Sequence, residues 1–387
     1  MSRGWASAAA AGGMFVFGVA NALLGAVLPL LSLKLRFDLA QAGALFTALN
    51  FGVLLTVAAA GRRIDRSGVK PAMTAGPLIV AAALVLAVAA DSYAMLLAAA
   101  FVLGLGGGAL NAATNTLIAD LNPDPRRKNA ALIVLGMFFG LGALTVPFAA
   151  GVWLDRVGLA GIVWSTAGLC AAAGGYAALL AFPGAKNPDP RRRAGTVSLL
   201  RTRSVQVTML LLFFQSGNEV ILAGYTTTFL TRDLGVGVRA ASWALTGLWA
   251  TVILARLGLA RLALVWSGDR IVMVSAAAAL LGALLLAASH SIPWAGAAIV
   301  LCGAGLAGVF PTILGMTGTR FREDSGAVFG VLLTGSRVGS MVLPWLAGHL
   351  AERAGPRAAL ALVALGAAAI LALQAISRKW HGVRPGG

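Results

Sequence analysis

The chain has 387 residues, of which 59% are hydrophobic and 11% are charged, and its mean hydropathy is +0.87. These values exclude a water-soluble protein and indicate a membrane protein. The net charge is +17, but the basic residues lie in short segments between hydrophobic runs. Membrane topology and lipid headgroups explain such a distribution, so we expect contact with the lipid bilayer and no nucleic-acid partner.

Hydrophobic segments of about 20 residues follow one another along the chain, each long enough for a membrane-spanning helix. In the first half the predicted spans are residues 12–33, 40–60, 71–90, 94–119, 129–154 and 158–182. In the second half they are residues 205–231, 241–259, 271–290, 293–317, 326–351 and 356–377. The sequence therefore predicts an all-α membrane protein with twelve transmembrane helices.

The orientation follows from the loops between these spans. Loops on the same side as both termini hold most of the 30 Lys and Arg residues. Because cytoplasmic loops carry the excess of basic residues, we expect both termini in the cytoplasm. High Ala, Gly and Arg content is typical of GC-rich bacteria, so the predicted location is a bacterial cytoplasmic membrane, crossed many times.

One sequence pattern occurs twice, 197 residues apart. Residues 147–158 read PxxAGxxxDRxG, and residues 344–355 read PxxAGxxxERxG. An offset of about half the chain indicates two parallel repeats of six spans. The predicted units are an N-terminal six-helix domain (residues 1–182), a cytoplasmic basic connector (183–203) and a C-terminal six-helix domain (204–387).

Two ionisable residues fall inside predicted spans, where charge is costly and usually serves a transport pathway. Glu219 is the only carboxylate well inside a hydrophobic span, and Arg337 lies among small residues in the eleventh span. We hypothesise that the two face one site and pair in at least one state, with a proton or an anionic solute competing for the pair. The alternative is a static link between helices.

Neutral polar and aromatic residues complete the predicted site. Asn111 and Asn115 share a helical face, as do Gln215, Asn218 and Glu219. Amides donate and accept, which suits sugar hydroxyls, and aromatic rings stack on a sugar's apolar face. Each Asn taken singly is equally explained by a hydrogen bond between helices. The predicted substrate-binding residues are Phe17, Asn21, Asn111, Asn115, Gln215, Asn218, Trp249 and Arg337, and the proton-coupling residues are Glu219 and Arg337.

A basic segment, GRRIDRSGVK, follows the second span at residues 61–70. We interpret it as a short loop in which glycine eases the reversal and Asp65 caps a helix or pairs with an arginine. It resembles the G-x-x-x-D-R-x-G-R-[RK] signature of the major facilitator superfamily, and residues 256–270 keep a weaker version. The resemblance implies a twelve-helix transporter whose cytoplasmic gate includes Gly61, Asp65, Arg66, Gly68, Lys70 and Arg256.

Within that superfamily the chain is most similar to the fucose permease-like sugar:proton symporters. The similar segments are residues 17–21 (FGVAN), 138–143 (FFGLGA) and 305–312 (GLAGVFPT), together with GLG at 104–106 before Asn111. That branch carries one acid in its first span and one in its fourth, where this chain has Gly25 and Asn111. Any proton coupling must therefore depend on Glu219.

These observations favour a proton-coupled secondary transporter, acting as a monomer, that takes up a sugar or similar small polar solute without cofactor or metal. A proton-driven exporter of amphipathic or drug-like compounds is the alternative, because Gly142, Pro147 and Gly151 partly match an antiporter signature. A non-transporting membrane sensor is a further alternative. An enzyme is disfavoured, because the histidines show no metal-ligand or nucleophile–base spacing.

Overall fold

The computed structural model describes residues 3–122, 125–182, 184, 201–320 and 325–382, and within them every regular element is an α-helix. The predicted connector 183–203 lies almost wholly outside these residues. In the first half of the chain the helices are α1 (Arg3–Leu35), α2 (Leu39–Ser67), α3 (Lys70–Ala89), α4 (Tyr93–Leu121) and α5 (Pro125–Leu179). In the second half they are α7 (Arg203–Arg232), α8 (Val238–Leu262), α9 (Gly268–Ala288), α10 (Ile292–Arg320), α11 (Ser325–Ala354) and α12 (Pro356–Gly382).

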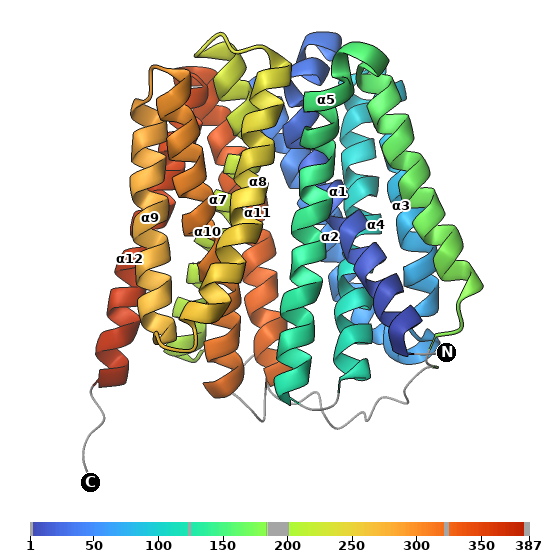
Figure 1. The fold of residues 1–387 in the computed structure, drawn as a ribbon, viewed down its shortest axis with the longest axis vertical. Coiled ribbons are helices and arrows are strands. Elements are labelled where there is room, and N and C mark those ends of the chain that lie inside the picture. Colours follow the sequence, from blue (N-terminus) through green and yellow to red (C-terminus); the bar gives the residue numbers. More distant parts are fainter. Residues whose placement is uncertain (1–2, 123–124, 183, 185–200, 321–324, 383–387) are drawn as a thin grey trace.

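Eleven helices in the described part of the chain are long and apolar enough to cross a membrane. One of them, α5, has 55 residues and a non-helical backbone at Gly158, with φ 65° and ψ −179°. Its apolar part, Val134–Leu179, would extend about 70 Å as one straight helix, more than twice a hydrocarbon core of about 30 Å. Figure 1 shows α5 turning over at one end of the bundle and returning. The turn falls at the predicted boundary between the fifth and sixth spans.

The segment after the second span is mostly helix. α2 continues to Ser67, and the chain reverses at Gly68, whose φ of 73° suits glycine and whose N–H donates to the carbonyl of Ile64 at 2.8 Å. The prediction of a loop over residues 61–70 was therefore wrong. The charged residues that follow the predicted span 40–60 belong to the same helix, where mean hydropathy no longer indicates a membrane-spanning segment.

The helix contacts of the first half are repeated in the second. α1 packs against α5 and α7 against α11, while α2 packs against α4 and α8 against α10. A Cβ on Gly142 of α5 would collide with the carbonyl oxygen of Phe15, and a Cβ on Gly339 of α11 would collide with that of Phe213. Small residues at these crossings allow the backbones to touch. The same arrangement of helices is thus built twice.

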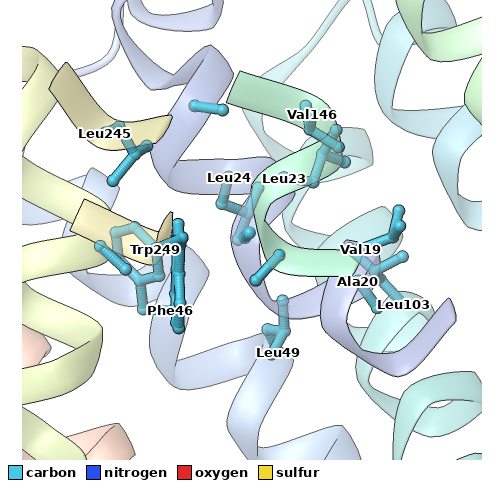
Figure 2. Packing of buried hydrophobic residues seen from close by; sticks show 14 of the residues in the cluster. Val19, Ala20, Leu23, Leu24, Phe46, Leu49, Leu103, Val146, Leu245 and Trp249 are labelled. Carbon is cyan, nitrogen blue, oxygen red and sulfur yellow. The ribbon is translucent and has the colours of Figure 1, made fainter. Parts of the chain in front are cut away.

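The two halves meet mainly through α2 with α11, α5 with α8, and α1 with α7. One apolar cluster crosses this boundary, since it contains Leu245 and Trp249 of α8 together with Leu24 of α1 and Phe46 of α2 (Figure 2). α1 begins and α12 ends at the same end of the bundle (Figure 1). Because the apolar cluster contains residues of both halves, helices of the two halves pack directly against each other.

At the other end of the bundle the halves are joined by polar contacts, two of which are related by the sequence repeat. Arg239, at the start of α8, donates to Asp155 and to the carbonyl of Gly151, each at 2.8 Å. The backbone N–H of Leu39, at the start of α2, donates to Glu352 at 2.9 Å. Asp155 and Glu352 hold the same position in the sequence repeat. We call these contacts the paired clasps, because each half holds the beginning of a helix from the other half.

Candidate functional site

Three charged side chains come together from α7, α8 and α11: Glu219, Arg256 and Arg337, called here the charged cluster. Glu219 lies close enough to both arginines to interact with them electrostatically. All three side chains are partly exposed. No ion pair within 4.0 Å joins them in the described chain. The predicted pair of Glu219 and Arg337 is therefore part of a three-member cluster that interacts through space.

Both arginines of the charged cluster reach the first half of the chain. The guanidinium carbon of Arg337 lies 5.6 Å from the centre of the Phe17 ring on α1, a cation–π distance. Nη1 of Arg256 donates to the carbonyl of Gly136 on α5 at 3.3 Å, and its Nε is buried without a hydrogen-bond partner. The cluster accordingly lies at the boundary between the two halves.

The crossing of α7 and α11 fixes the position of Arg337. The hydroxyls of Ser216 and Ser336, both buried, are 2.7 Å apart and hydrogen-bonded. Gly335 and Gly339, two residues to either side of Arg337, pack directly against α7. The small residues around Arg337 thus let the two helices approach closely, and the arginine is the one large side chain in this stretch of α11.

Three aromatic rings from different helices adjoin the charged cluster. The ring centres of Phe17 on α1 and Phe139 on α5 are 5.3 Å apart, and Phe139 meets Trp249 of α8 edge-on at 5.9 Å. Trp249 is only 3% exposed, and its Nε1 has no hydrogen-bond partner. Phe17 and Trp249 were predicted as site residues, and Phe139 connects them. We call these three rings the aromatic wall.

The predicted amides of the first half lie near Phe17. Nδ2 of Asn115 donates to Oδ1 of Asn111 at 3.0 Å and to its carbonyl at 2.7 Å, so the two share one face of α4. Gly107, one turn before Asn111, packs against the Phe17 ring. This amide pair is therefore one to two turns along α4 from the aromatic wall. Asn21 donates to the carbonyl of Phe17 at 2.9 Å, within its own helix.

The predicted amides of the second half face other helices of that half. Nε2 of Gln215 donates to the carbonyl of Leu306 on α10 at 3.0 Å. Asn218 is fully buried against Gly366 of α12, and neither of its amide atoms has a hydrogen-bond partner. Adjacent helical residues point about 100° apart, so Asn218 and Glu219 meet different neighbours. The structure brings Glu219, but not these two amides, to the arginines.

The predicted gate residues lie around the turn between α2 and α3. Arg66 and Lys70 are exposed on the last turn of α2 and the first of α3, and Gly68 is buried in the turn between them. Gly61 and Asp65 belong to the helical end of α2, but the surroundings of their side chains lie outside the described part of the structure. The arrangement of these residues around a gate therefore stays a prediction.

Two members of the site were not predicted: Phe139, and Arg256 as a partner of Glu219. Arg256 was assigned to the gate because it begins the weaker version of the gate motif at residues 256–270. It follows Trp249 by seven residues, which places both on one face of α8. That spacing was the available signal. For Phe139 the sequence offers no comparable signal, because which face of α5 meets α8 depends on the packing of the halves.

Comparison with known proteins identifies the family. Residues 10–217 and, separately, residues 208–383 match the Major Facilitator Superfamily. The uncharacterized MFS-type transporter YfkL of Bacillus subtilis (strain 168) is 24% identical over 364 residues, which cover 88% of this chain and 87% of YfkL. Each half of the chain thus matches the family by itself.

Two crystal structures share the fold. The nucleoside transporter NupG has a TM-score of 0.78 and 14% identity, covering 97% of this chain and 99% of NupG. The Escherichia coli fucose:proton symporter FucP has a TM-score of 0.68 and 20% identity, covering 96% of this chain and 98% of FucP. The second likeness agrees with the resemblance to fucose permease-like proteins. The chain belongs to the Major Facilitator Superfamily and is a multi-pass transporter of the cell membrane rather than an enzyme.

Proposed function

We propose that this transporter couples the inward movement of protons to the uptake of a small polar solute, with Glu219 as the proton-coupling residue. The observation that supports this most is the position of Glu219 beside Arg256 and Arg337 at the boundary between the halves. Ionisable residues at such depth usually belong to a transport pathway. A carboxylate held beside two fixed cations is also a group whose protonation changes the charge that a solute meets.

The proposed mechanism is alternating access, in which the two halves rock about the site between them. Proton binding neutralises Glu219 and leaves the two arginines without their internal counter-charge. The solute then takes the place of that counter-charge, and both are released when the halves open to the cytoplasm. The amide pair Asn111–Asn115 and the aromatic wall supply hydrogen bonds and apolar contact from the first half.

The topology that accompanies this mechanism is also a proposal. We infer twelve crossings, with α5 contributing two that meet at Gly158, and two six-helix domains at residues 1–182 and 204–387. The basic loops place both termini in the cytoplasm. The paired clasps then lie on the outer side of the membrane. The protein acts as a monomer, because each repeat already finds its counterpart within the chain.

The test uses vesicles that contain the purified protein. A thermal-shift screen with hexoses, organic acids and hydrophobic cations first selects the solute that raises the melting temperature most. An imposed inward proton gradient should then drive accumulation of that solute. We expect Glu219→Gln to lose this accumulation but to keep solute exchange at equal concentrations, because the amide cannot release a proton. The control is Asp91→Asn, an exposed carboxylate between α3 and α4. Accumulation by Glu219→Gln equal to that of the parent protein would exclude the coupling role.

Export of an amphipathic compound is the second candidate. Gly142 and Gly151 of α5 pack against Phe15 and Trp243, so the glycines of the antiporter-like segment lie at helix contacts with both halves. Reversing the proton gradient in the same vesicles separates the two directions. An exporter accumulates the solute only when the proton gradient runs opposite to solute movement.

A further inference from the structure

The site contains more positive charge and more hydrogen-bond donors than its own groups can satisfy. Arg256 and Arg337 carry two positive charges, and Glu219 carries one negative charge. Nε of Arg256 and Nε1 of Trp249 are buried without acceptors. Guanidinium and indole N–H groups can only donate hydrogen bonds. The complementary group is therefore an acceptor that carries negative charge.

Nearby polar groups of the described chain do not supply that acceptor. The carbonyl of Gly136 is occupied by Nη1 of Arg256 at 3.3 Å. The hydroxyls of Ser216 and Ser336 bond to each other at 2.7 Å. Gln215 reaches α10, where it donates to the carbonyl of Leu306. A buried donor left without an acceptor is unfavourable, so an incoming group that satisfies these donors is favoured.

The surroundings of these donors are flat and apolar. The aromatic wall places the Phe17 ring 5.6 Å from the guanidinium carbon of Arg337 and 5.3 Å from the ring of Phe139. Trp249, which provides one of the free N–H groups, meets Phe139 edge-on at 79°. A planar or apolar body packs favourably beside rings in such arrangements. The rings and the donors come from α1, α5, α8 and α11, so both halves contribute to one site.

We propose that the transported solute is an organic anion, whose carboxylate-type group binds between Arg256 and Arg337 and whose planar or apolar body lies against the aromatic wall. The proposal rests on the proposed transport function and names the chemical class of its solute. A planar carboxylate accepts two parallel hydrogen bonds from a guanidinium, which is the strongest match available to these side chains. Glu219 then acts as an internal competitor for the same two cations.

Other solute classes fit this site less well. Sugar hydroxyls could bond to Glu219 and to the amide pair Asn111–Asn115, but a neutral sugar would leave the second positive charge of the arginines without a counter-charge. A hydrophobic cation would meet two arginines with a single carboxylate to offset them, and like charges at close range are unfavourable. The excess of one positive charge therefore selects an anion over both alternatives.

The experiment measures binding to the full chain in lipid nanodiscs by titration calorimetry. The probes are benzoate, its neutral analogue benzamide and the cation benzylamine, with indole-3-acetate as a larger anion. We expect one or both anions to bind and the amide and amine to bind at least tenfold more weakly. Arg256→Gln and Arg337→Gln should each weaken anion binding about 10- to 100-fold. Glu219→Gln should strengthen it, because the internal competitor has lost its charge.

The control is Arg261→Gln, an exposed arginine on the same helix as Arg256, which should leave anion binding unchanged. The opposite effects of the Glu219 and arginine variants separate this proposal from a purely structural role, since misfolding would weaken binding in all of them. Binding of benzamide equal to that of benzoate, preference for benzylamine, or no binding of either anion would overturn the inference. Failure of proton coupling in the vesicle assay, with anion binding intact, would reject the proposed coupling alone.

Discussion

Glu219 has two cationic neighbours on different helices, so the effect of changing one of these three side chains depends on the other two. Arg256 holds the carbonyl of Gly136 and faces α5, whereas Arg337 lies against Phe17 and faces α1. Each arginine thus connects Glu219 to a different helix of the first half. Removing one charged member of the cluster leaves the others with unbalanced charge, which is usually costlier than removing both partners.

This coupling between residues is measurable by a double-mutant cycle. We expect Glu219→Gln and Arg256→Gln each to lower unfolding stability, and the double variant to lose less than the sum, with a coupling free energy of about 0.5 to 3 kcal/mol. The measurement is reversible unfolding in mixed detergent micelles. A cycle between Glu219→Gln and Arg261→Gln serves as control and should be additive within about 0.5 kcal/mol. Additivity in both cycles would contradict the existence of the charged cluster.

At the scale of elements, the position of the site residues depends on how closely α7 and α11 cross. Its closeness depends on Gly339, where a Cβ would meet the carbonyl oxygen of Phe213, and on the hydrogen bond between Ser216 and Ser336. The equivalent crossing of α1 and α5 uses Gly142 against Phe15. In both halves the helices that carry site residues are thus brought together by glycine at the point of contact.

Gly339→Ala should therefore destabilise the protein by about 1 to 3 kcal/mol, because the added methyl group forces α11 away from α7. The matched variant is Gly330→Ala on the same helix, where a Cβ meets nothing within 4 Å. It should be neutral or stabilising by up to about 1 kcal/mol, since alanine favours the helix. Thermal unfolding in detergent compares the two. Equal melting temperatures for both variants would show that moving α11 away from α7 does not destabilise the protein.

Much of the fold was predictable because a span of about 20 apolar residues has few alternatives to a membrane helix. The end of α2 was not predictable, because mean hydropathy falls over its charged final turns although the helix continues to Ser67. The site was predictable only in part. Rarity of charge within spans identified Glu219 and Arg337, but the sequence does not specify which helices the neighbouring Asn218 and Gln215 face, because that depends on packing between helices.

At the scale of the whole molecule, the paired clasps hold the two halves together at one end of the bundle. Arg239 with Asp155 and Leu39 with Glu352 are related by the sequence repeat. The Arg239–Asp155 pair is solvent-exposed, at 56% and 64% of the side-chain surfaces. Exposed ion pairs contribute only about 0 to 1 kcal/mol. Such contacts are weak enough to break in every transport cycle, yet strong enough to bias the position of the halves.

Removing both clasps should shift the halves toward opening at this end without unfolding the protein. We expect Arg239→Ala combined with Glu352→Ala to increase labelling of a cysteine introduced as Thr47→Cys several-fold, because 1.4 kcal/mol corresponds to a tenfold change in population. Thr47 donates to the carbonyl of Met341 across the boundary at 3.0 Å. The reagent is a membrane-impermeant maleimide, and the native Cys170 and Cys302 are buried.

The control for this labelling experiment is Asp91→Asn, an exposed carboxylate in the turn between α3 and α4, which should leave the rate unchanged. Each single clasp variant should fall between the parent protein and the double variant. Labelling that stays at the parent rate in the double variant would show that the remaining contacts between the halves keep this end closed without the clasps.

The two arginines and one carboxylate also decide how transport responds to voltage. An anion that enters with one proton adds no net charge, so the loaded and empty carriers are electrically identical. Over a complete cycle the membrane potential then does no net work, because the work on the loaded step and on the empty return step cancels, and only the pH difference drives accumulation. A neutral solute carried with the same proton would gain about 2.3 kcal/mol per 100 mV. The charge of the solute thus decides whether this carrier generates current.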